Sequence, residues 1–452
     1  MSQTPTKENK MGTMPIPKLL ISMSLPMIIS MLVQALYNIV DSMFVSRLCE
    51  EALTAVSYAF PVQNFMIAVA SGTAVGINAL LSRNLGERKF DEANNVAKNG
   101  LFLAIISAVL FAIVGLSGSG LFFNLQSKNE LIRTYGTQYM MIITVCSFAQ
   151  FIQMTCERLL QSTGKTFYSM ITQATGAIIN IILDPILIFG LFGFPRLEVA
   201  GAAIATVFGQ FVAACLAIFF NLTKNHDISI NFKGFRPSGK IIKNIYQVGV
   251  PSILMMSIGS ILTLAMNKIL NGFSETAVAV YGVYFKLQSF IFMPVFGLNN
   301  GMIPIIAYNY GARQRKRILD TIKLSVLFAV SIMTVGLIIF QLYPQTMLSI
   351  FDASENMLAI GVPALRTISW SFTFAGFSIV MGSVFQALGN GFYSLTVSVC
   401  RQLLTILPLA YIFAKFFGLD MVWWAIPMAE LVSLTLSILL FRRIYKLKIK
   451  EL

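Results

Sequence analysis

The sequence predicts an all-α integral membrane protein: twelve transmembrane helices forming two six-helix bundles, related by a pseudo-twofold axis along the membrane normal. Three observations predict this fold class. The 452-residue chain is 56% hydrophobic and 12% charged, with a mean hydropathy of +0.75. Its apolar segments recur at the length of a bilayer-spanning helix. Its second half repeats residues of the first at a constant spacing.

The elements follow in chain order as apolar runs of about 20 residues or more between polar breaks. The start, 1–18, is polar and lacks a small-residue cleavage site, so we expect a cytoplasmic tail and no removable signal peptide. The first bundle, 19–221, contains the predicted spans 19–46, 52–81, 94–117, 131–156, 165–191 and 200–221. A polar linker, 222–243, is interpreted as a solvated tether. The second bundle, 244–441, contains the spans 244–271, 276–306, 318–343, 356–382, 391–415 and 421–441, and a basic tail, 442–452, ends the chain.

Basic residues indicate the orientation. An even number of spans places both termini on one side, and 22 of the 33 lysine and arginine residues fall in the loops and tails of that side. The opposite loops, such as "NGFSET", contain few of them. Because cytoplasmic loops are enriched in Lys and Arg, we expect a multi-pass plasma membrane protein with both termini in the cytoplasm. The net charge of +14 then reflects topology, and nucleic-acid binding is excluded.

The repeat has an offset of 225 residues and needs no gap over six spans. It aligns Pro26 with Pro251, Gln63 with Gln288, Gly72 and Gly76 with Gly297 and Gly301, and Asn84 and Gly86 with Asn309 and Gly311. Six spans per copy mean that both copies enter the membrane in the same direction. The glycine pairs have the small-xxx-small spacing that allows helices to approach closely, which favours packing over a binding role.

Several kinds of chemistry are excluded by what the sequence lacks. The five cysteines are scattered without CxxC spacing, and the only histidine, His226, lies in the linker. The string "STGKTFYS" resembles the end of a phosphate-binding loop, but Leu159 stands where its first glycine is needed. We therefore expect no enzyme, no metal site and no cofactor. Without a nucleotide site, an ion gradient, of H⁺ or Na⁺, is the expected energy source.

Two aspartates inside the spans are the first candidates for that ion. An ionised residue costs roughly 2.5 to 3.5 kcal/mol at the bilayer centre, so Asp41 and Asp184 are functional candidates. Helical spacing places Gln34, Tyr37 and Asn38 near Asp41, and Asn180 one turn before Asp184. We predict one polar pocket in the outer half of the first bundle, lined by these residues. The alternative is that each aspartate is held by a neighbouring amide or base as structural glue.

A second group of charged residues is assigned lower priority, because its members could neutralise one another. Glu430 is interpreted as a partner for one of the three bases inside the spans. Glu157 is placed near the membrane interface, where solvation lowers the energetic cost of its charge. The group is Glu157, Lys286, Arg366, Arg401 and Glu430.

Two prolines fall where they would bend a span. Pro26 in the first span and Pro185 in the fifth each remove a backbone donor and crowd the preceding turn. A bend beside an acid links its protonation to helix shape, so both prolines are predicted gating kinks. In the second half Leu409 replaces Asp184, and Pro408 lies one position before it.

With its twelve spans, its repeat, Asp41 and the string "NIILDPILIFG", the sequence resembles the multidrug and toxic compound extrusion (MATE) family over nearly its whole length. Within the family it is most similar to a bacterial MepA-like branch. The resemblance implies that Asp41 and Asp184 bind the coupling cation, that Pro26 bends the first span, and that Tyr37, Asn38 and Asn180 line the pocket. Another branch has carboxylates in spans seven and ten, where this sequence has none.

The leading hypothesis is therefore a multidrug efflux antiporter, with a role in antibiotic resistance, that exports amphipathic and often cationic compounds in exchange for H⁺ or Na⁺. Its expected partners are such drugs and membrane lipids, and we expect a monomer. An alternative is a flippase for lipid-linked or polyanionic precursors, with Lys286, Arg366 and Arg401 holding phosphates. A membrane sensor without a transport cycle is a third hypothesis.

Overall fold

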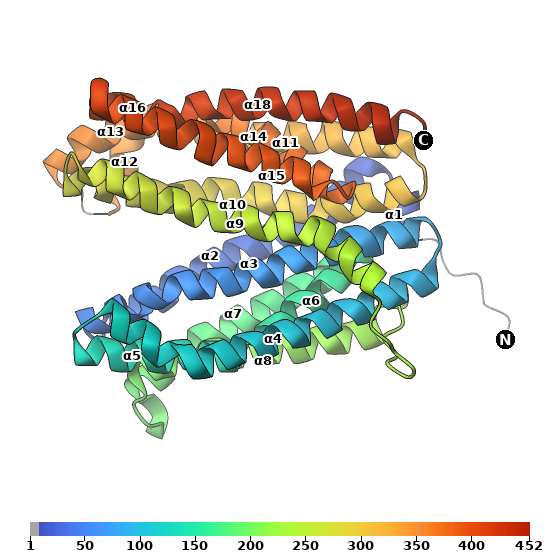
Figure 1. Cartoon of the computed structure of the whole chain (residues 1–452), viewed down its shortest axis with the longest axis horizontal. Helices are drawn as coiled ribbons and strands as arrows, with labels where there is room; N and C mark the ends of the chain where they lie inside the picture. Colours follow the sequence, from blue (N-terminus) through green and yellow to red (C-terminus); the bar gives the residue numbers. More distant parts are fainter. Residues whose placement is uncertain (1–8, 352) are drawn as a thin grey trace.

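The computed structural model describes residues 9–351 and 353–452, and every regular element within them is helical (Figure 1). The first half of the chain forms α1 (Lys10–Thr13), α2 (Ile16–Ser46), α3 (Glu50–Gly86), α4 (Phe90–Gln126), α5 (Glu130–Val145), α6 (Phe148–Ser162), α7 (Thr166–Phe189) and α8 (Glu198–Thr223). The second half forms α9 (Gly239–Asn271), α10 (Glu275–Gly311), α11 (Arg315–Leu342), α12 (Pro344–Ser349), α13 (Glu355–Ser369), α14 (Phe372–Ala387), α15 (Gly391–Arg401), α16 (Leu407–Phe416), α17 (Leu419–Val422) and α18 (Ala425–Ile444). Residues 1–8 of the predicted N-terminal tail lie outside the described part.

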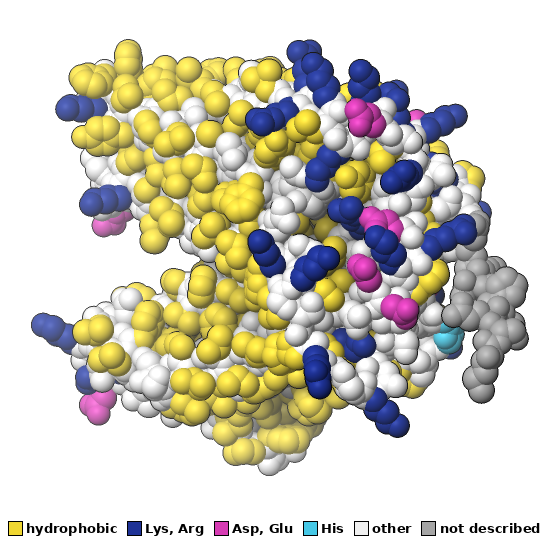
Figure 2. Space-filling model, turned by 45° about the vertical axis from the view of Figure 1, so that its right-hand side comes forward, with side chains coloured by type: hydrophobic (Ala, Val, Ile, Leu, Met, Phe, Trp, Pro, Cys, Tyr) yellow, Lys and Arg dark blue, Asp and Glu magenta, His cyan; other side chains and the backbone are white. Residues whose placement is uncertain are grey.

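The long helices run side by side in two groups, α2 to α8 and α9 to α18, which correspond to the two predicted bundles (Figure 1). Lysine and arginine side chains gather at the end of the molecule that also carries α1 and the C-terminus (Figure 2). We call this the basic end. At the opposite end, which we call the open end, the two groups part and leave a hollow between them (Figure 2).

The predicted number of spans agrees with the structure. In the described part of the chain, ten helices are long and apolar enough to cross a membrane alone, and two pairs of helices meet the same test together. These pairs are α5 with α6, bent by 44°, and α13 with α14, bent by 51°. Counting each pair as one span gives the twelve predicted from the sequence. Equivalent spans of the repeat are thus broken at equivalent positions.

The bent spans run further than the apolar pattern indicates. The predicted spans 131–156 and 356–382 end early, because α6 continues to Ser162 and α14 to Ala387. Hydropathy misses the last turn of α6, whose polar side chains are paired inside the protein. Ser162 Oγ lies 2.9 Å from Asn78 Oδ1, and Gln161 Nε2 donates to Ser169 Oγ at 2.8 Å.

Glycines fix the contact between the two halves. α3 packs along α9, and α10 packs along α2 in the repeat-related way. A Cβ atom on Gly76 would stand 2.1 Å from the backbone oxygen of Ile245, and one on Gly301 would stand 2.8 Å from Ser24 Cα. Because any side chain here would collide with backbone, the predicted packing role of these glycines holds.

The tail before the first span is part of the fold. Asn9 caps the short helix α1 through Met11 N at 3.0 Å and donates to Thr163 O of the first half at 3.0 Å. From the second half, Arg317 donates to Met11 O at 2.9 Å, and Asn309 donates to the same oxygen at 3.0 Å. α1 therefore ties the two halves together at the basic end.

The linker also differs from the solvated tether that was expected. α9 begins at Gly239, inside the predicted linker 222–243, and α8 ends at Thr223. The segment between them lies against α4, where Ser229 N donates to Asn94 Oδ1 at 2.7 Å and Ile228 is buried. The apolar residues that the linker carries among its polar ones explain the difference, because they need a surface to cover. Similarly, α18 runs to Ile444, into the predicted tail 442–452.

Candidate functional site

The two aspartates singled out by the sequence meet in the structure. α2 and α7 are neighbours in the first half. Each aspartate precedes the last residue of its helix by five positions, on the side of the open end. The Asp41 and Asp184 carboxyls are hydrogen-bonded to each other, and Asp184 has no exposed surface. Because a carboxylate is an acceptor only, this hydrogen bond needs a proton on one of the two acids.

Asn180 and Thr206 hold the Asp184 side of the pair. In the amide orientation that satisfies every neighbour, Asn180 donates to Asp184 Oδ2 at 3.0 Å. Its oxygen then accepts from the backbone nitrogen and the hydroxyl of Thr206, at 3.0 and 3.1 Å. Asn180 and Thr206 are both buried. This chain of hydrogen bonds joins α7 to α8 and fixes the orientation of the carboxyl group.

Two tyrosines complete the cluster. Tyr37, one turn before Asp41, shares a hydrogen bond with Thr206. Tyr139 of α5 is buried, lies near Asp41 and Tyr37, and shares a hydrogen bond with Gln63 of α3. Sequence reasoning missed Tyr139, Gln63 and Thr206 as site residues, because they come from three further helices. Gln63 alone carried a signal, since it matches Gln288 in the repeat.

The cluster leaves acceptor oxygens unused. Asp41 Oδ1 and Asp184 Oδ1 are buried, and no amide, hydroxyl or base among the described residues donates to them. A buried acceptor without a partner costs about 1 to 3 kcal/mol. A bound proton or small cation removes that cost, so the chemistry that this arrangement supports is cation binding by oxygen ligands.

Two of the predicted lining residues lie outside the buried cluster. Gln34 and Asn38 are exposed on α2, whereas Tyr37 is half-buried. Helical spacing placed all three near Asp41, but only a narrow stripe of α2 is covered by α7. Their place in the predicted pocket stays a prediction.

Glu157 differs most from its sequence interpretation. It was placed near the interface in solvent, but only 2% of its surface is exposed. Its carboxylate accepts from Gln153 at 3.0 Å, Thr172 at 3.0 Å and Gln173 at 2.8 Å. These side chains of α6 and α7 give Glu157 the hydrogen bonds that solvent would otherwise supply. The sequence gives no sign of this pairing, because the partners lie on two different helices.

The deep bases separate into one pair and two exposed side chains. Arg401 and Glu430 form the expected ion pair, with Nη1 and Oε1 3.0 Å apart. Lys286 and Arg366 are exposed, and the Lys286 ammonium lies 5.8 Å from the centre of the Phe351 ring. Lys286 precedes Gly297 by 11 residues, about three helical turns, which places it on the face of α10 that turns toward α2.

Comparison with known families decides the class of protein. The MatE family model matches residues 26–186 and, a second time, residues 251–412. The chain belongs to the MATE family. The two matches begin at the repeat-related prolines Pro26 and Pro251, so this MATE chain carries the family's unit twice. Both site aspartates lie in the first match.

Relatives with stated functions are transporters. The multidrug export protein MepA of Staphylococcus haemolyticus is 26% identical over 421 residues, which cover 93% of this chain and 92% of that protein. An FAD transporter of Shewanella oneidensis is 29% identical over 421 residues, covering 92% of each chain. A solved multidrug resistance MATE transporter in an outward-facing conformation matches with a TM-score of 0.92 and 28% identity, covering 99% of this chain and all of that one. This MATE-family chain is therefore a multi-pass membrane protein of a multidrug transporter family.

The predicted bends at the prolines stay predictions. α2 continues without a break past Pro26, and α7 continues past Pro185 to Phe189, where Gly190 in a left-handed conformation ends it. In the second half the corresponding region contains a π-helical segment, Gln402–Ile406, between α15 and α16. There Thr405 Oγ1 donates at 2.7 Å to Cys400 O, five residues earlier in the chain, whereas a hydroxyl in a regular α-helix reaches the carbonyl four residues earlier. The two MATE repeats thus differ in backbone as well as in charge at this point.

Proposed function

We propose that the protein is an antiporter that exports amphipathic cations in exchange for H⁺, with Na⁺ as the alternative ion, at Asp41 and Asp184. One observation carries this proposal: two carboxyls meet inside the first half within hydrogen-bond reach of each other, and each has a buried oxygen to which no amide, hydroxyl or base donates. Such a pair changes its charge by gaining or losing a proton without leaving the protein interior. Tyr37, Asn180, Thr206 and Tyr139 position it.

Exchange follows from mutual exclusion. With a shared proton the pair carries one negative charge, and without it two charges stand side by side, which is unfavourable in a buried site. A cation bound nearby relieves that repulsion, and a returning proton displaces the cation. The predicted bends at Pro26 and Pro185 are proposed to let α2 and α7 adjust to these states.

The orientation is part of the proposal. We infer that the basic end faces the cytoplasm, because Lys and Arg are enriched in cytoplasmic loops. The hollow at the open end then faces outward, in keeping with the outward-facing relative.

The test is purified protein in liposomes, with an imposed pH gradient or Na⁺ gradient and ethidium as the fluorescent cation. Exchange of one proton per monovalent cation is electrically neutral and supports about tenfold accumulation per pH unit. Exchange of two protons per cation supports about hundredfold accumulation per pH unit, and it also responds to the membrane potential because it moves net charge. If neither gradient moves ethidium, the proposed antiport is wrong.

Asp184→Asn keeps the shape of the side chain but removes its ability to gain and lose a proton. We expect a folded protein with gradient-driven transport reduced at least tenfold. Asp91→Asn, at an exposed position on α4, is the matched control and should transport like the wild type. Equal transport by both variants would make Asp184 a structural residue.

A second candidate substrate is an anionic aromatic compound such as FAD, favoured by the FAD transporter relative. Lys286, exposed on the face of α10 that turns toward α2, is proposed to bind its phosphates. Liposomes assayed for FAD release distinguish the two candidates. Lys286→Gln should lower FAD transport and leave ethidium transport unchanged if the anion is the substrate.

A further inference from the structure

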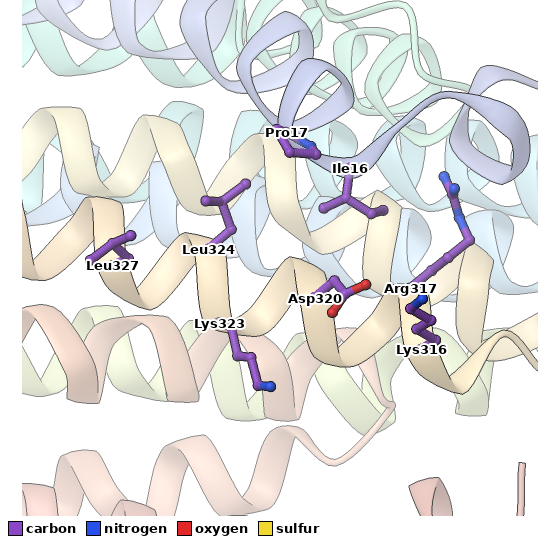
Figure 3. A pocket seen from close by; sticks show the side chains of 8 residues that line it. All are labelled: Ile16, Pro17, Lys316, Arg317, Asp320, Lys323, Leu324 and Leu327. Atoms are coloured by element: carbon purple, nitrogen blue, oxygen red, sulfur yellow. The ribbon is translucent and has the colours of Figure 1, made fainter.

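A groove at the basic end lies between the start of α2 and the first four turns of α11 (Figure 3). Its volume is about 550 Å³. The residues that line it are Ile16, Pro17, Lys316, Arg317, Asp320, Lys323, Leu324 and Leu327. Three bases against one acid leave the groove with a net positive charge.

Along α11, the charged side chains of the groove lie nearer the basic end and the apolar ones lie deeper in the span. Lys316, Asp320, Lys323 and Leu327 are separated by three or four residues and share one face of the helix. Lys316 is nearest the basic end, Lys323 is roughly 10 Å further into the span, and Leu327 is deeper still and 60% exposed. A phospholipid has the same order, because its charged headgroup lies above its acyl chains.

The repeat-related groove in the first half is filled by the chain itself. At an offset of 225 residues, Lys316 corresponds to Asp91 and Leu327 to Phe102. There the linker covers α4, with Phe235 and Phe102 ring centres 5.9 Å apart and Ser238 N donating to Asn99 Oδ1 at 3.0 Å. Among the described residues, no such segment covers the groove beside α11. Lys316 and Arg317 also stand where the first half has the acids Asp91 and Glu92, whereas Lys323 corresponds to Lys98.

The groove also touches both halves of the protein. Ile16 and Pro17 begin α2 of the first half, whereas α11 belongs to the second. Arg317, at its edge, is the residue that donates to Met11 O and Met14 O, at 2.9 and 2.8 Å, and so holds α1. A molecule bound here contacts both halves where α1 joins them.

We propose that this groove binds an anionic phospholipid, with the headgroup phosphate at Lys316 and Lys323 and an acyl chain along Leu324 and Leu327. Basic pockets between transmembrane helices bind such headgroups. The bound lipid holds α2 against α11 and favours the conformation in which the basic end is closed. This inference does not depend on which compound the protein carries.

The experiment measures lipid binding to the detergent-purified full chain by native mass spectrometry. The probe is phosphatidylglycerol, compared with phosphatidylcholine of the same acyl chains. The test variant is Lys316→Gln with Lys323→Gln. The control is Lys240→Gln with Lys243→Gln, which removes the same charge from exposed positions of α9. Each lysine at the headgroup contributes roughly fivefold in affinity, so the test variant should bind phosphatidylglycerol about 25-fold more weakly, and the control within twofold of the wild type.

A second variant tests the site by gain of binding. Asp320→Asn removes the acid that lines the groove, and we expect it to bind phosphatidylglycerol more tightly than the wild type. Equal phosphatidylglycerol binding by all variants, or equal binding of phosphatidylcholine, would overturn the proposal. Displacement of the lipid by millimolar inorganic phosphate would also overturn it, because the site would then be one for free anions.

Discussion

Replacing Gly76 by alanine tests the contact between the two halves. The new Cβ atom would stand 2.1 Å from the backbone oxygen of Ile245 on α9. A backbone atom cannot rotate away as a side chain does, so α3 and α9 must separate by roughly 1.5 Å to reach a normal contact distance. Gly100→Ala meets the end of the Ile77 side chain at 2.7 Å, and Gly118→Ala meets nothing within 4 Å.

The three variants gain the same helix propensity and differ in the cost of overpacking. Alanine is favoured over glycine inside a helix by about 1 kcal/mol at each position. Overpacking costs about 1 to 3 kcal/mol, and Gly76→Ala should lie at the upper end of that range. Relative to Gly118→Ala, we therefore expect the free energy of unfolding to fall by about 3 kcal/mol for Gly76→Ala, and by about 1 kcal/mol for Gly100→Ala.

The assay is unfolding by SDS in mixed micelles, followed by circular dichroism. The ranking of the three variants is the result that matters, because their common helix propensity cancels. If Gly76→Ala is as stable as Gly118→Ala, α3 and α9 do not pack as closely as the structure has them, and the glycine argument for the interface is wrong.

Three further predictions concern ion pairs and the basic end. Glu430→Gln leaves Arg401 without its partner and should lower the free energy of unfolding, whereas Glu430→Gln combined with Arg401→Gln should recover part of the loss. Burial disfavours the charged form of Glu87, but the hydrogen bonds and positive charges of Lys89 and Arg83 outweigh this effect and lower the pKa of Glu87. These ion pairs therefore stabilise the protein above the ordinary pKa of a glutamate, and this stabilisation is lost as the pH falls through the lowered pKa. Melting curves should therefore show that Glu87→Gln lowers the melting temperature more at pH 7 than at pH 3. Asn309→Ala removes a donor to Met11 O, so a cysteine introduced by Met11→Cys in a cysteine-free background should react faster with maleimide in that variant.

The sequence predicted what depends on hydropathy and spacing. The spans and the repeat follow from hydropathy and from the offset of 225 residues, and helical spacing groups Tyr37 with Asp41 and Asn180 with Asp184. The breaks in spans four and ten had no such signal. Cys146 and Ser147 separate α5 from α6 without a proline or glycine. A serine hydroxyl that bonds a backbone carbonyl, as Ser147 does to Ala108 O at 3.3 Å, becomes visible only in three dimensions.

Pairing between distant helices explains the remaining differences. Tyr139 and Thr206 belong to the cluster because α5 and α8 pack beside α2 and α7, and no local pattern indicates this. Glu157 looked like a residue near solvent because Arg158 follows it, yet the arginine pairs elsewhere, with Gln161 Oε1 and Asn300 Oδ1, each at 2.9 Å. A charged dipeptide at the end of a span therefore does not locate the membrane interface when other helices supply hydrogen bonds.

α2 is the element that connects the proposed ion site to the other half of the protein. Toward the basic end, Ser24 and Ile28 fit against Gly301 and Gly297 of α10 with no room for a side chain. Toward the open end, the same helix carries one acid of the pair. Pro26 is buried between the two tightly packed residues, so a bend there cannot change without disturbing the contact with α10. In the second half, Pro251 is buried at the equivalent place, but the equivalent of Asp41 is the buried Met266. The same packing arrangement therefore exists twice, and of the two equivalent positions the one on α2 carries the acid.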